Sequence, residues 1–264
     1  MTTQAVPVRV TALQVFARTC GAEWLRLWTV KATWWFVAVA ASIMIGLGAV
    51  AGFDAGGDSP PPPDATAWTA AHFTVLPALF LFLALVLTAV TSDYATGGII
   101  PTLQWTPRRT ILFLARTIVA VTTATALGTA LALASALAAF TGAHPALDLP
   151  LPEGINTLTT IAFVFATTTA LAAGLGFTLR NTAGGLVAIF LLILLLPLVL
   201  PQFGYHWLTT IADLLPGSRA VYLLNGEPTD RGFTHTSSAI VLLTWSTLTL
   251  LLGHLRLHHT DANH

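Results

Sequence analysis

Charged side chains are scarce in this chain. Aspartate, glutamate, lysine and arginine together make up 8% of the 264 residues, whereas 55% are hydrophobic. A soluble domain usually carries about 25% charged residues, which give its surface groups that water solvates. Lipid must therefore solvate much of this protein. The composition excludes a soluble globular fold and predicts an integral membrane protein.

Lysine and cysteine each occur once. Lys31 lies in TVKATWW, with no glycine-rich turn before it. A phosphate-binding P-loop needs a lysine after such a turn, so the sequence excludes this type of nucleotide site. The single cysteine, Cys20, excludes an intrachain disulfide. The formal net charge of zero gives no basic surface that would indicate nucleic acid binding.

Ionisable residues are almost absent from the middle of the apolar runs. His72 and His254 lie near the ends of two runs, and Arg116 is close enough to the start of another for its side chain to reach the membrane surface. Proton-driven carriers usually need buried acids or histidines, and hydrolases need a nucleophile with its base or metal ligands. We therefore predict no catalytic, cofactor-binding or metal-binding residues. We expect the histidines of the C-terminal tail to be solvated: His258, His259 and His264.

Six apolar segments are long enough to cross a bilayer, for which about 20 residues suffice. They are Ala32–Gly52, Trp68–Ser92, Thr110–Phe140, Asn156–Leu179, Gly184–Pro201 and Ser237–Leu257. The fifth is short, and two prolines at its end predict a break near the membrane surface. The predicted fold is thus an all-α polytopic membrane protein with six transmembrane helices, forming a single domain over residues 1–264.

The basic residues are distributed unevenly over the connecting segments. With an even number of spans, nine of the 11 lysines and arginines fall on the side of the termini. The other two, Arg219 and Arg231, fall in outer segments. Because cytoplasmic segments carry the excess of lysine and arginine, we predict that both termini are cytoplasmic and that the protein lies in the cell (plasma) membrane.

Residues 9–31 show helical periodicity before the first span. Apolar residues recur at spacings of three and four: Leu13, Phe16, Cys20, Trp24 and Leu27. The polar residues Arg18, Glu23 and Arg26 lie off this stripe. We predict an amphipathic helix on the inner membrane surface, an interfacial elbow with Trp24, Arg26 and Trp28 at its turn into the bilayer. The alternative is a plain juxtamembrane anchor.

Two further features concern the outer side and the spans. Residues 202–236 contain Pro216-Gly217 between apolar stretches, which predicts two short helices in a broken, re-entrant outer segment.

The third and fourth spans are rich in threonine, alanine and glycine, which allow close helix packing. Their hydroxyls would alternatively give a mildly polar lining for an amphiphilic substrate.

The loop TSDYATGGIIPTLQWTPRR lies on the predicted cytoplasmic side, between the second and third spans. Asp93 can pair with an arginine or cap a turn, and Gly97-Gly98 permits a sharp bend. Arg108 and Arg109 are placed at the lipid headgroups. From the residues alone, an anchor that obeys the positive-inside rule is a sufficient explanation.

The longer stretch TSDYATGGIIPTLQWTPRRTILFLAR resembles actinobacterial permease subunits of ABC-2 type transporters. In that family the loop has an acid, an aromatic, small residues, glycine, an isoleucine-rich run, Pro-Arg-Arg and a basic residue in the next helix. Asp93 stands where the family more often has glutamate, and Arg116 stands where lysine is usual. The second glycine and Pro101 are less typical.

The resemblance implies a function as the transmembrane subunit of an ATP-driven exporter. It implies that residues 93–109 form a cytoplasmic coupling loop that docks on a separate ATP-binding subunit. The coupling residues would be Asp93, Gly97, Gly98, Arg108, Arg109 and Arg116, whose charges would lock the loop onto the spans.

Partners and cargo follow from the same resemblance. Two ATP-binding subunits would bind ATP and Mg, and two permeases would pair as a homodimer or heterodimer within the membrane lipid. This chain would hold no cofactor and would not be an enzyme. The substrate would be amphiphilic, such as a drug, a peptide antibiotic or a lipid-like compound, which connects the chain with multidrug or antibiotic resistance.

The alternative is an ATP-independent membrane protein, either a secondary carrier or a membrane scaffold. A carrier should show charges near the membrane midplane or an inverted repeat. Neither is visible in this sequence.

Overall fold

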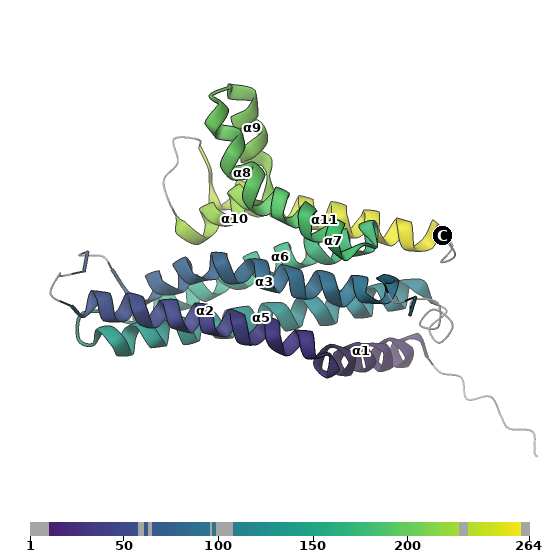
Figure 1. Cartoon of the computed structure of the whole chain (residues 1–264), viewed down its shortest axis with the longest axis horizontal. Helices are drawn as coiled ribbons and strands as arrows, with labels where there is room; N and C mark the ends of the chain where they lie inside the picture. Colours follow the sequence, from purple (N-terminus) through teal and green to yellow (C-terminus); the bar gives the residue numbers. More distant parts are fainter. Residues whose placement is uncertain are drawn as a thin grey trace, which may run out of the picture.

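The computed structural model describes residues 11–57, 61–62, 65–95, 97–98, 108–226 and 232–259. All regular elements of this part of the chain are helical (Figure 1). Six helical segments are long and apolar enough to cross a membrane: Lys31–Ala55, Ala67–Ala95, Arg109–Ala143, Leu151–Leu179, Thr182–Phe203 and His235–His258. The predicted all-α fold with six membrane-length helices is therefore confirmed.

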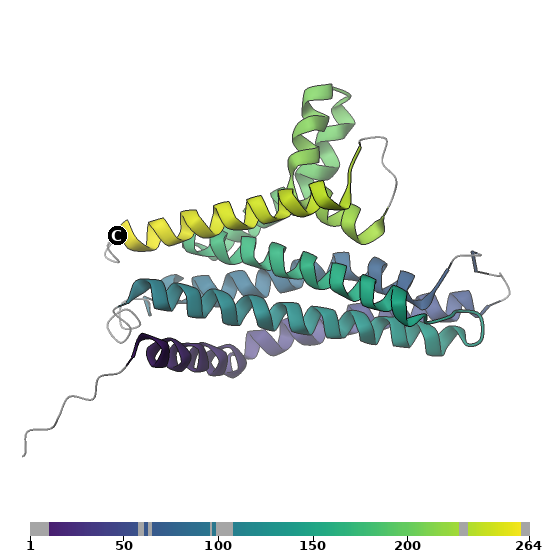
Figure 2. The same ribbon diagram turned by 180° about the vertical axis from the view of Figure 1, so that it is seen from behind.

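The longest elements form a bundle of elongated helices. They are α1 (Ala12–Thr29), α2 (Lys31–Ala55), α3 (Ala67–Ala95), α5 (Arg109–Ala143), α6 (Leu151–Leu179) and α11 (His235–His259). Helix α3 lies at the centre, because it packs against α2, α5 and α6 and supplies much of the buried core. Helices α2 and α11 lie on opposite sides of this core (Figure 1; Figure 2).

The termini of the described chain lie at one end of the bundle. Helix α1 and the end of α11 are both at the end where α3 stops and α5 begins (Figure 1). An even number of membrane-length helices requires this arrangement. His258, which we expected to be solvated, is exposed, although the helix α11 continues through His259.

The chain turns between α1 and α2 at a single extended residue, Val30. The Thr33 hydroxyl donates to the Leu27 carbonyl at 2.6 Å, and Trp34 Nε1 donates to the Trp28 carbonyl at 3.0 Å. These bonds satisfy carbonyls that the end of α1 leaves without helical partners. The predicted helix over residues 9–31 is present as α1, and residues 9–10 lie outside the described part.

The fifth membrane-length segment changes helical pitch instead of breaking, which corrects the expected break. It runs from α7 (Thr182–Phe190) through a π-helical turn (Leu191–Leu195) and α8 (Leu196–Val199) to a 3-10 turn (Leu200–Phe203). Pro197 has no N–H, and its ring clashes with the carbonyl four residues earlier. The wider π turn directly before it accommodates this clash.

Two short helices follow, α9 (His206–Leu214) and α10 (Pro216–Asn225). Pro216 is the first residue of α10, where its missing N–H costs nothing. Helices α8 and α9 stand out from the bundle (Figure 1; Figure 2). Residues 227–231 of the predicted re-entrant segment lie outside the described part.

Helices α6 and α11 approach each other closely at Gly174. A Cβ atom at Gly174 would lie 2.4 Å from the Thr249 carbonyl carbon and 2.6 Å from the Leu250 nitrogen. Both are backbone atoms, so a side chain there would separate the helices. Small residues at such crossings allow the backbone contact on which membrane helices depend.

We expect Gly174→Ala to destabilise the protein by about 1–3 kcal/mol, because the methyl group overpacks the α6–α11 contact. The measurement is the thermal unfolding midpoint of the purified protein in detergent. Gly46→Ala is the matched control, since a Cβ there meets nothing within 4 Å. Equal midpoints for the two variants would contradict the close approach.

Candidate functional site

Arg116 of α5 lies where α1, α3 and α5 meet, and it is only 2% exposed. Its Nε and Nη2 donate to the two carboxylate oxygens of Glu23 in α1, at 3.1 and 2.8 Å. Nη2 also donates to Asp93 Oδ2 near the end of α3, at 2.7 Å. Such paired, charge-assisted bonds are among the strongest in proteins and fix the geometry of both partners.

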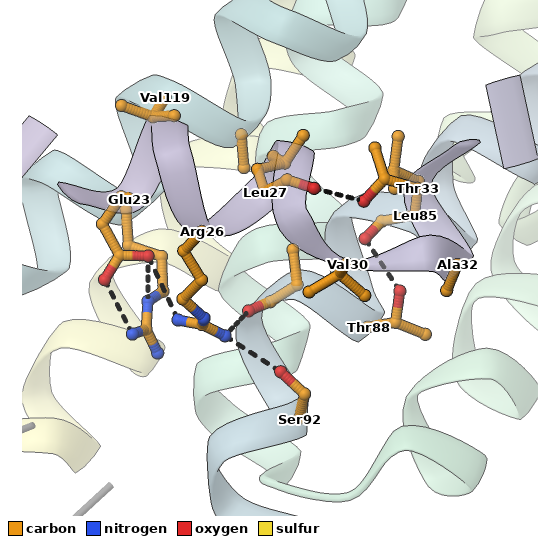
Figure 3. Close-up of a pocket in the computed structure, with 13 residues that line it drawn as sticks. Glu23, Arg26, Leu27, Val30, Ala32, Thr33, Leu85, Thr88, Ser92 and Val119 are labelled. Atoms are coloured by element: carbon orange, nitrogen blue, oxygen red, sulfur yellow. Dashed lines mark hydrogen bonds and ion pairs between the residues drawn. The ribbon is translucent and has the colours of Figure 1, made fainter. Parts of the chain in front are cut away.

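Arg26 of α1 pairs with the same two carboxylates. Its Nη1 lies 3.1 Å from Glu23 Oε2 and 3.1 Å from Asp93 Oδ2. Its Nη2 donates to the Ala89 carbonyl at 2.8 Å and to the Ser92 hydroxyl at 2.9 Å. Figure 3 shows Glu23 and Arg26 next to each other, with Arg26 directed toward Ser92. We call Glu23, Arg26, Asp93 and Arg116 the charge cluster.

The formal charges of the charge cluster cancel, with two guanidinium groups facing two carboxylates. Burial lowers the pKa of Arg26, the positive charge of Arg116 lowers it further, and Glu23 and Asp93 act in the opposite direction. Arginine stays protonated in proteins even when its pKa falls. The charge cluster therefore holds permanent cations, and its contribution depends on both carboxylates staying ionised.

Glu23 and Arg26 reach the charge cluster because they lie three residues apart on one face of α1. Leu27 is buried on the same face, whereas Trp24 is 47% and Leu13 76% exposed. The apolar stripe is therefore divided: Leu27 packs against the bundle, whereas Leu13 and Trp24 stay exposed, where lipid can cover them. The face turned to the bundle includes the charged pair, since Arg116 offers it a partner that lipid cannot.

The structure brings together three of the residues that the sequence singled out, namely Arg26, Asp93 and Arg116. Asp93 pairs with arginines, one of the two roles expected for it. Arg116 does not extend to the surface as expected, because its two carboxylate partners hold it in the protein interior.

Arg108 and Arg109 do not join these three. Arg108 is exposed at the start of α5. Arg109 donates to the Leu257 and His258 carbonyls of α11, at 2.9 and 3.2 Å. Arg109 thus fastens the start of α5 to another span, α11, where the final carbonyls of a helix favour a cation. The coupling role expected for Arg108 and Arg109 stays a prediction.

Arg180 and Arg256 make contacts of the same kind between α6 and α11. Arg180 Nη2 donates to the Arg256 carbonyl at 2.9 Å, and Arg256 Nη1 donates to the Thr178 carbonyl. Arg180 also lies over the ring of Tyr94, 5.3 Å from its centroid. Arg109, Arg180 and Arg256 therefore bind backbone carbonyls at this end of the bundle.

The predicted coupling loop is described only at its two ends. Gly97 has a φ of +71°, a left-handed conformation that glycine adopts without strain. Gly98 forms part of the same turn. Thr96 and residues 99–107 lie outside the described part. At the elbow, the Trp24 and Trp28 rings meet edge to face with centroids 5.7 Å apart.

Glu23 was missed as a site residue by the sequence analysis. The sequence analysis placed it off the apolar stripe and assigned it no partner. The available signal was its rarity, since only two other acids, Asp93 and Asp261, fall on the predicted cytoplasmic side. An acid and a base three residues apart in one helix, together with an arginine inside the apolar run of another helix, indicate an ion-pair network.

Many threonine hydroxyl groups of α5 and α6 form hydrogen bonds within their own helix. Their hydroxyls donate to carbonyls three or four residues back in Thr122, Thr123, Thr141, Thr159, Thr167, Thr168, Thr169 and Thr178. Thr74 bonds across helices to Ser135 at 3.0 Å. A shallow groove on the α5–α6 face is lined by Thr122, Thr125 and Thr129 among alanines and leucines. These bonds support the expected packing role, whereas the groove is almost entirely apolar, so the alternative of a mildly polar lining stays a prediction.

Arg219 holds the outer segment together. Its Nε donates to the Asp213 carbonyl at 2.6 Å, and its guanidinium lies 3.8 Å from the centroid of the Phe233 ring. Burial lowers the pKa of Arg219, and the negative charge of Asp213 opposes this change. The residue joins α9, α10 and the approach to α11, so its role is to fix the outer helices.

Neither a scan against protein-family models nor a search of the curated proteins found a match to this chain. A functional interpretation must therefore come from the residues and their geometry.

We expect Glu23→Gln to destabilise the protein by about 3 kcal/mol, because it leaves a buried guanidinium without one of its two carboxylates. The free energy of unfolding in detergent is the measurement. Glu153→Gln is the control, since this exposed acid only accepts a bond from Thr66. A loss no larger than that of the control would show that the charge cluster does not hold α1 in place.

Cys20 provides a second, chemical test of the same region. Burial raises the pKa of its thiol, and the negative charge of Glu23 raises it further. Because the thiolate is the reactive form, iodoacetamide should alkylate Cys20 more slowly at pH 7.5 than it alkylates the chain unfolded in urea. Glu23→Gln should shift the pH profile of the rate to lower pH. An unchanged profile would contradict the electrostatic contact between the two side chains.

Proposed function

We propose that the chain is the transmembrane permease subunit of an ATP-driven ABC exporter. In this proposal, residues 93–109 are a cytoplasmic coupling loop and a separate subunit hydrolyses ATP. The absence of a P-loop lysine from the sequence is consistent with this division of labour. The resemblance of the loop to ABC-2 type permeases supports an ATP-binding subunit as the partner.

The charge cluster is the observation on which the proposal depends most. Asp93 begins the loop segment, and Arg116 lies about two turns into the helix that follows it. Their ion pair joins the two ends of the loop, and Glu23 and Arg26 attach both to α1. A force applied to the loop would thus move α1, α3 and α5 together, as a coupling element requires.

Arg108 is the side chain of the loop base that we assign to the partner contact. It is exposed, whereas Arg109 binds the carbonyls at the end of α11. An acidic groove on the ATP-binding subunit would complement the Arg108 guanidinium. Two copies of that subunit would act on two permeases, with both termini of each permease in the cytoplasm.

The exposed apolar surface of the fifth span is compatible with a pair of permeases. Along α7, only Gly185 and Ile189 are buried within the chain. A second permease copy or lipid must cover the rest of this surface. The cargo would be amphiphilic, with the α5–α6 groove as the path of its apolar part, because the lining of that groove is mainly apolar.

We expect Arg108→Glu to weaken retention of an ATP-binding subunit roughly tenfold, since charge reversal at a paired interface position removes an attraction and adds a repulsion. The measurement is the amount of P-loop ATPase, and its ATP hydrolysis, that copurifies with the tagged chain from native membranes. Lys31→Glu is the matched control, because Lys31 is an exposed cation at the start of α2.

Two outcomes would contradict the proposed function. The first is equal retention of the ATPase by both variants. The second is transport by the purified, reconstituted chain without any ATP-binding subunit. Transport by the chain alone would favour the secondary carrier, and a chain that neither transports nor retains an ATPase would favour the scaffold.

A further inference from the structure

Three arginines from three helices gather around the last turn of α11. Arg109 of α5 donates to two of the final carbonyls of α11, at 2.9 and 3.2 Å. Arg180, at the end of α6, donates to the carbonyl of Arg256 at 2.9 Å. Arg256 itself belongs to α11 and donates to the Thr178 carbonyl of α6. Neutral backbone oxygens thus hold these side chains, and we call Arg109, Arg180 and Arg256 the arginine triad.

The arginine triad carries more positive charge than its surroundings neutralise. Neither Arg180 nor Arg256 forms an ion pair with a described carboxylate. The two described acids at this end, Glu23 and Asp93, pair with the arginines of the charge cluster. The ends of α6 and α11 supply only about half an elementary negative charge each. The remaining acid on the predicted cytoplasmic side is Asp261, outside the described residues, and one carboxylate added to the two helix ends would still leave a positive excess.

The arginine triad lies where the membrane-length helices end. Arg109 is the first residue of α5, Arg180 follows the last residue of α6, and Arg256 lies in the last turn of α11. Helix α11 runs along one side of the bundle, so its last turn borders the surrounding membrane (Figure 2). Basic residues at the ends of membrane-spanning helices reach the lipid headgroups. Arg256 is exposed, and only its Nη1 has an acceptor among the described residues, so its other N–H groups are available to a molecule outside the chain.

A phosphate group complements the arginine triad in charge and in hydrogen-bonding geometry. The planar guanidinium group binds two phosphate oxygens through parallel, charge-assisted hydrogen bonds. At the level of the headgroups, phosphate belongs to phospholipids, and basic sites between membrane helices recognise anionic headgroups in this way. A headgroup with a net negative charge fits better than a zwitterionic one, because a choline or ethanolamine cation would meet the same arginines.

We propose that the arginine triad binds the headgroup of one anionic phospholipid from the leaflet on the predicted cytoplasmic side. Phosphate oxygens accept hydrogen bonds from the exposed Arg256, and the negative charge reduces the repulsion among the three guanidinium groups. The bound lipid thereby stabilises the contacts of α11 with α5 and α6. This inference does not depend on the proposed exporter function, because it uses only the charges and their position at the helix ends.

The first test compares two lipids that differ in headgroup charge. The full-length protein in detergent is titrated with palmitoyl-oleoyl phosphatidylglycerol and with phosphatidylcholine of the same acyl chains, and native mass spectrometry counts the lipids bound per chain. We expect one phosphatidylglycerol to bind with a Kd roughly tenfold lower than that of phosphatidylcholine. The difference should shrink when ammonium acetate is raised from about 0.1 M to about 0.5 M, since salt screens exposed charges.

Substitutions at Arg256 test the location. Arg256→Gln removes one charge and should reduce the preference for phosphatidylglycerol roughly fivefold, whereas Arg256→Lys keeps the charge and should lose less. Arg18→Gln is the matched control, because Arg18 is an exposed arginine of α1, on the side of the bundle away from α11 (Figure 1). Phosphatidylglycerol should also raise the thermal unfolding midpoint of the wild-type protein more than that of Arg256→Gln.

Three results would overturn the proposal. Equal affinities for the two lipids at low salt would remove the role of the headgroup charge. Equal losses in Arg256→Gln and Arg18→Gln would show a diffuse attraction to this end of the protein instead of a site. Stabilisation by inorganic phosphate that equals stabilisation by phosphatidylglycerol would show that the arginine triad binds free anions and not lipid.

Discussion

The burial of one guanidinium group organises the predicted cytoplasmic end of this protein. Arg116 is 2% exposed in a bundle that offers little water. Removing such a charge from water is costly, and the arrangement persists because two carboxylates pair with Arg116, while Arg26 balances their remaining charge. Apolar packing alone would permit α1 to slide or rotate against α3 and α5. The bidentate contact with Glu23 allows one register, so the charge cluster contributes specificity of position more than net stability.

The positive-inside count treats all arginines on the predicted cytoplasmic side as equivalent, but the structure divides them by the groups that they bind. Arg26 and Arg116 neutralise carboxylates. Arg109, Arg180 and Arg256 bind backbone carbonyls at the ends of α6 and α11. Many of these arginines therefore bind groups of the same chain. For this reason the proposed contact with an ATP-binding subunit depends on Arg108 and not on a broad basic patch.

The sequence predicts the fold well, because the number and length of apolar runs directly determine how many helices can cross a bilayer. Pro216 likewise marks the boundary between α9 and α10 through its own chemistry. The face that α1 turns to the bundle could not be predicted in this way. Its apolar stripe indicates which side chains lipid can cover, and Leu13 and Trp24 are exposed, but the stripe does not single out Glu23 as a buried contact. The deciding partner, Arg116, lies 93 residues from Glu23, and no local pattern contains that pairing.

The same long-range pairing determines how the cluster can respond to its surroundings. Arginine does not lose its proton under physiological conditions, so neither cation of the cluster can act as a pH switch. Motion of α1 against α3 and α5 must instead come from a force that breaks the ion pairs of the charge cluster.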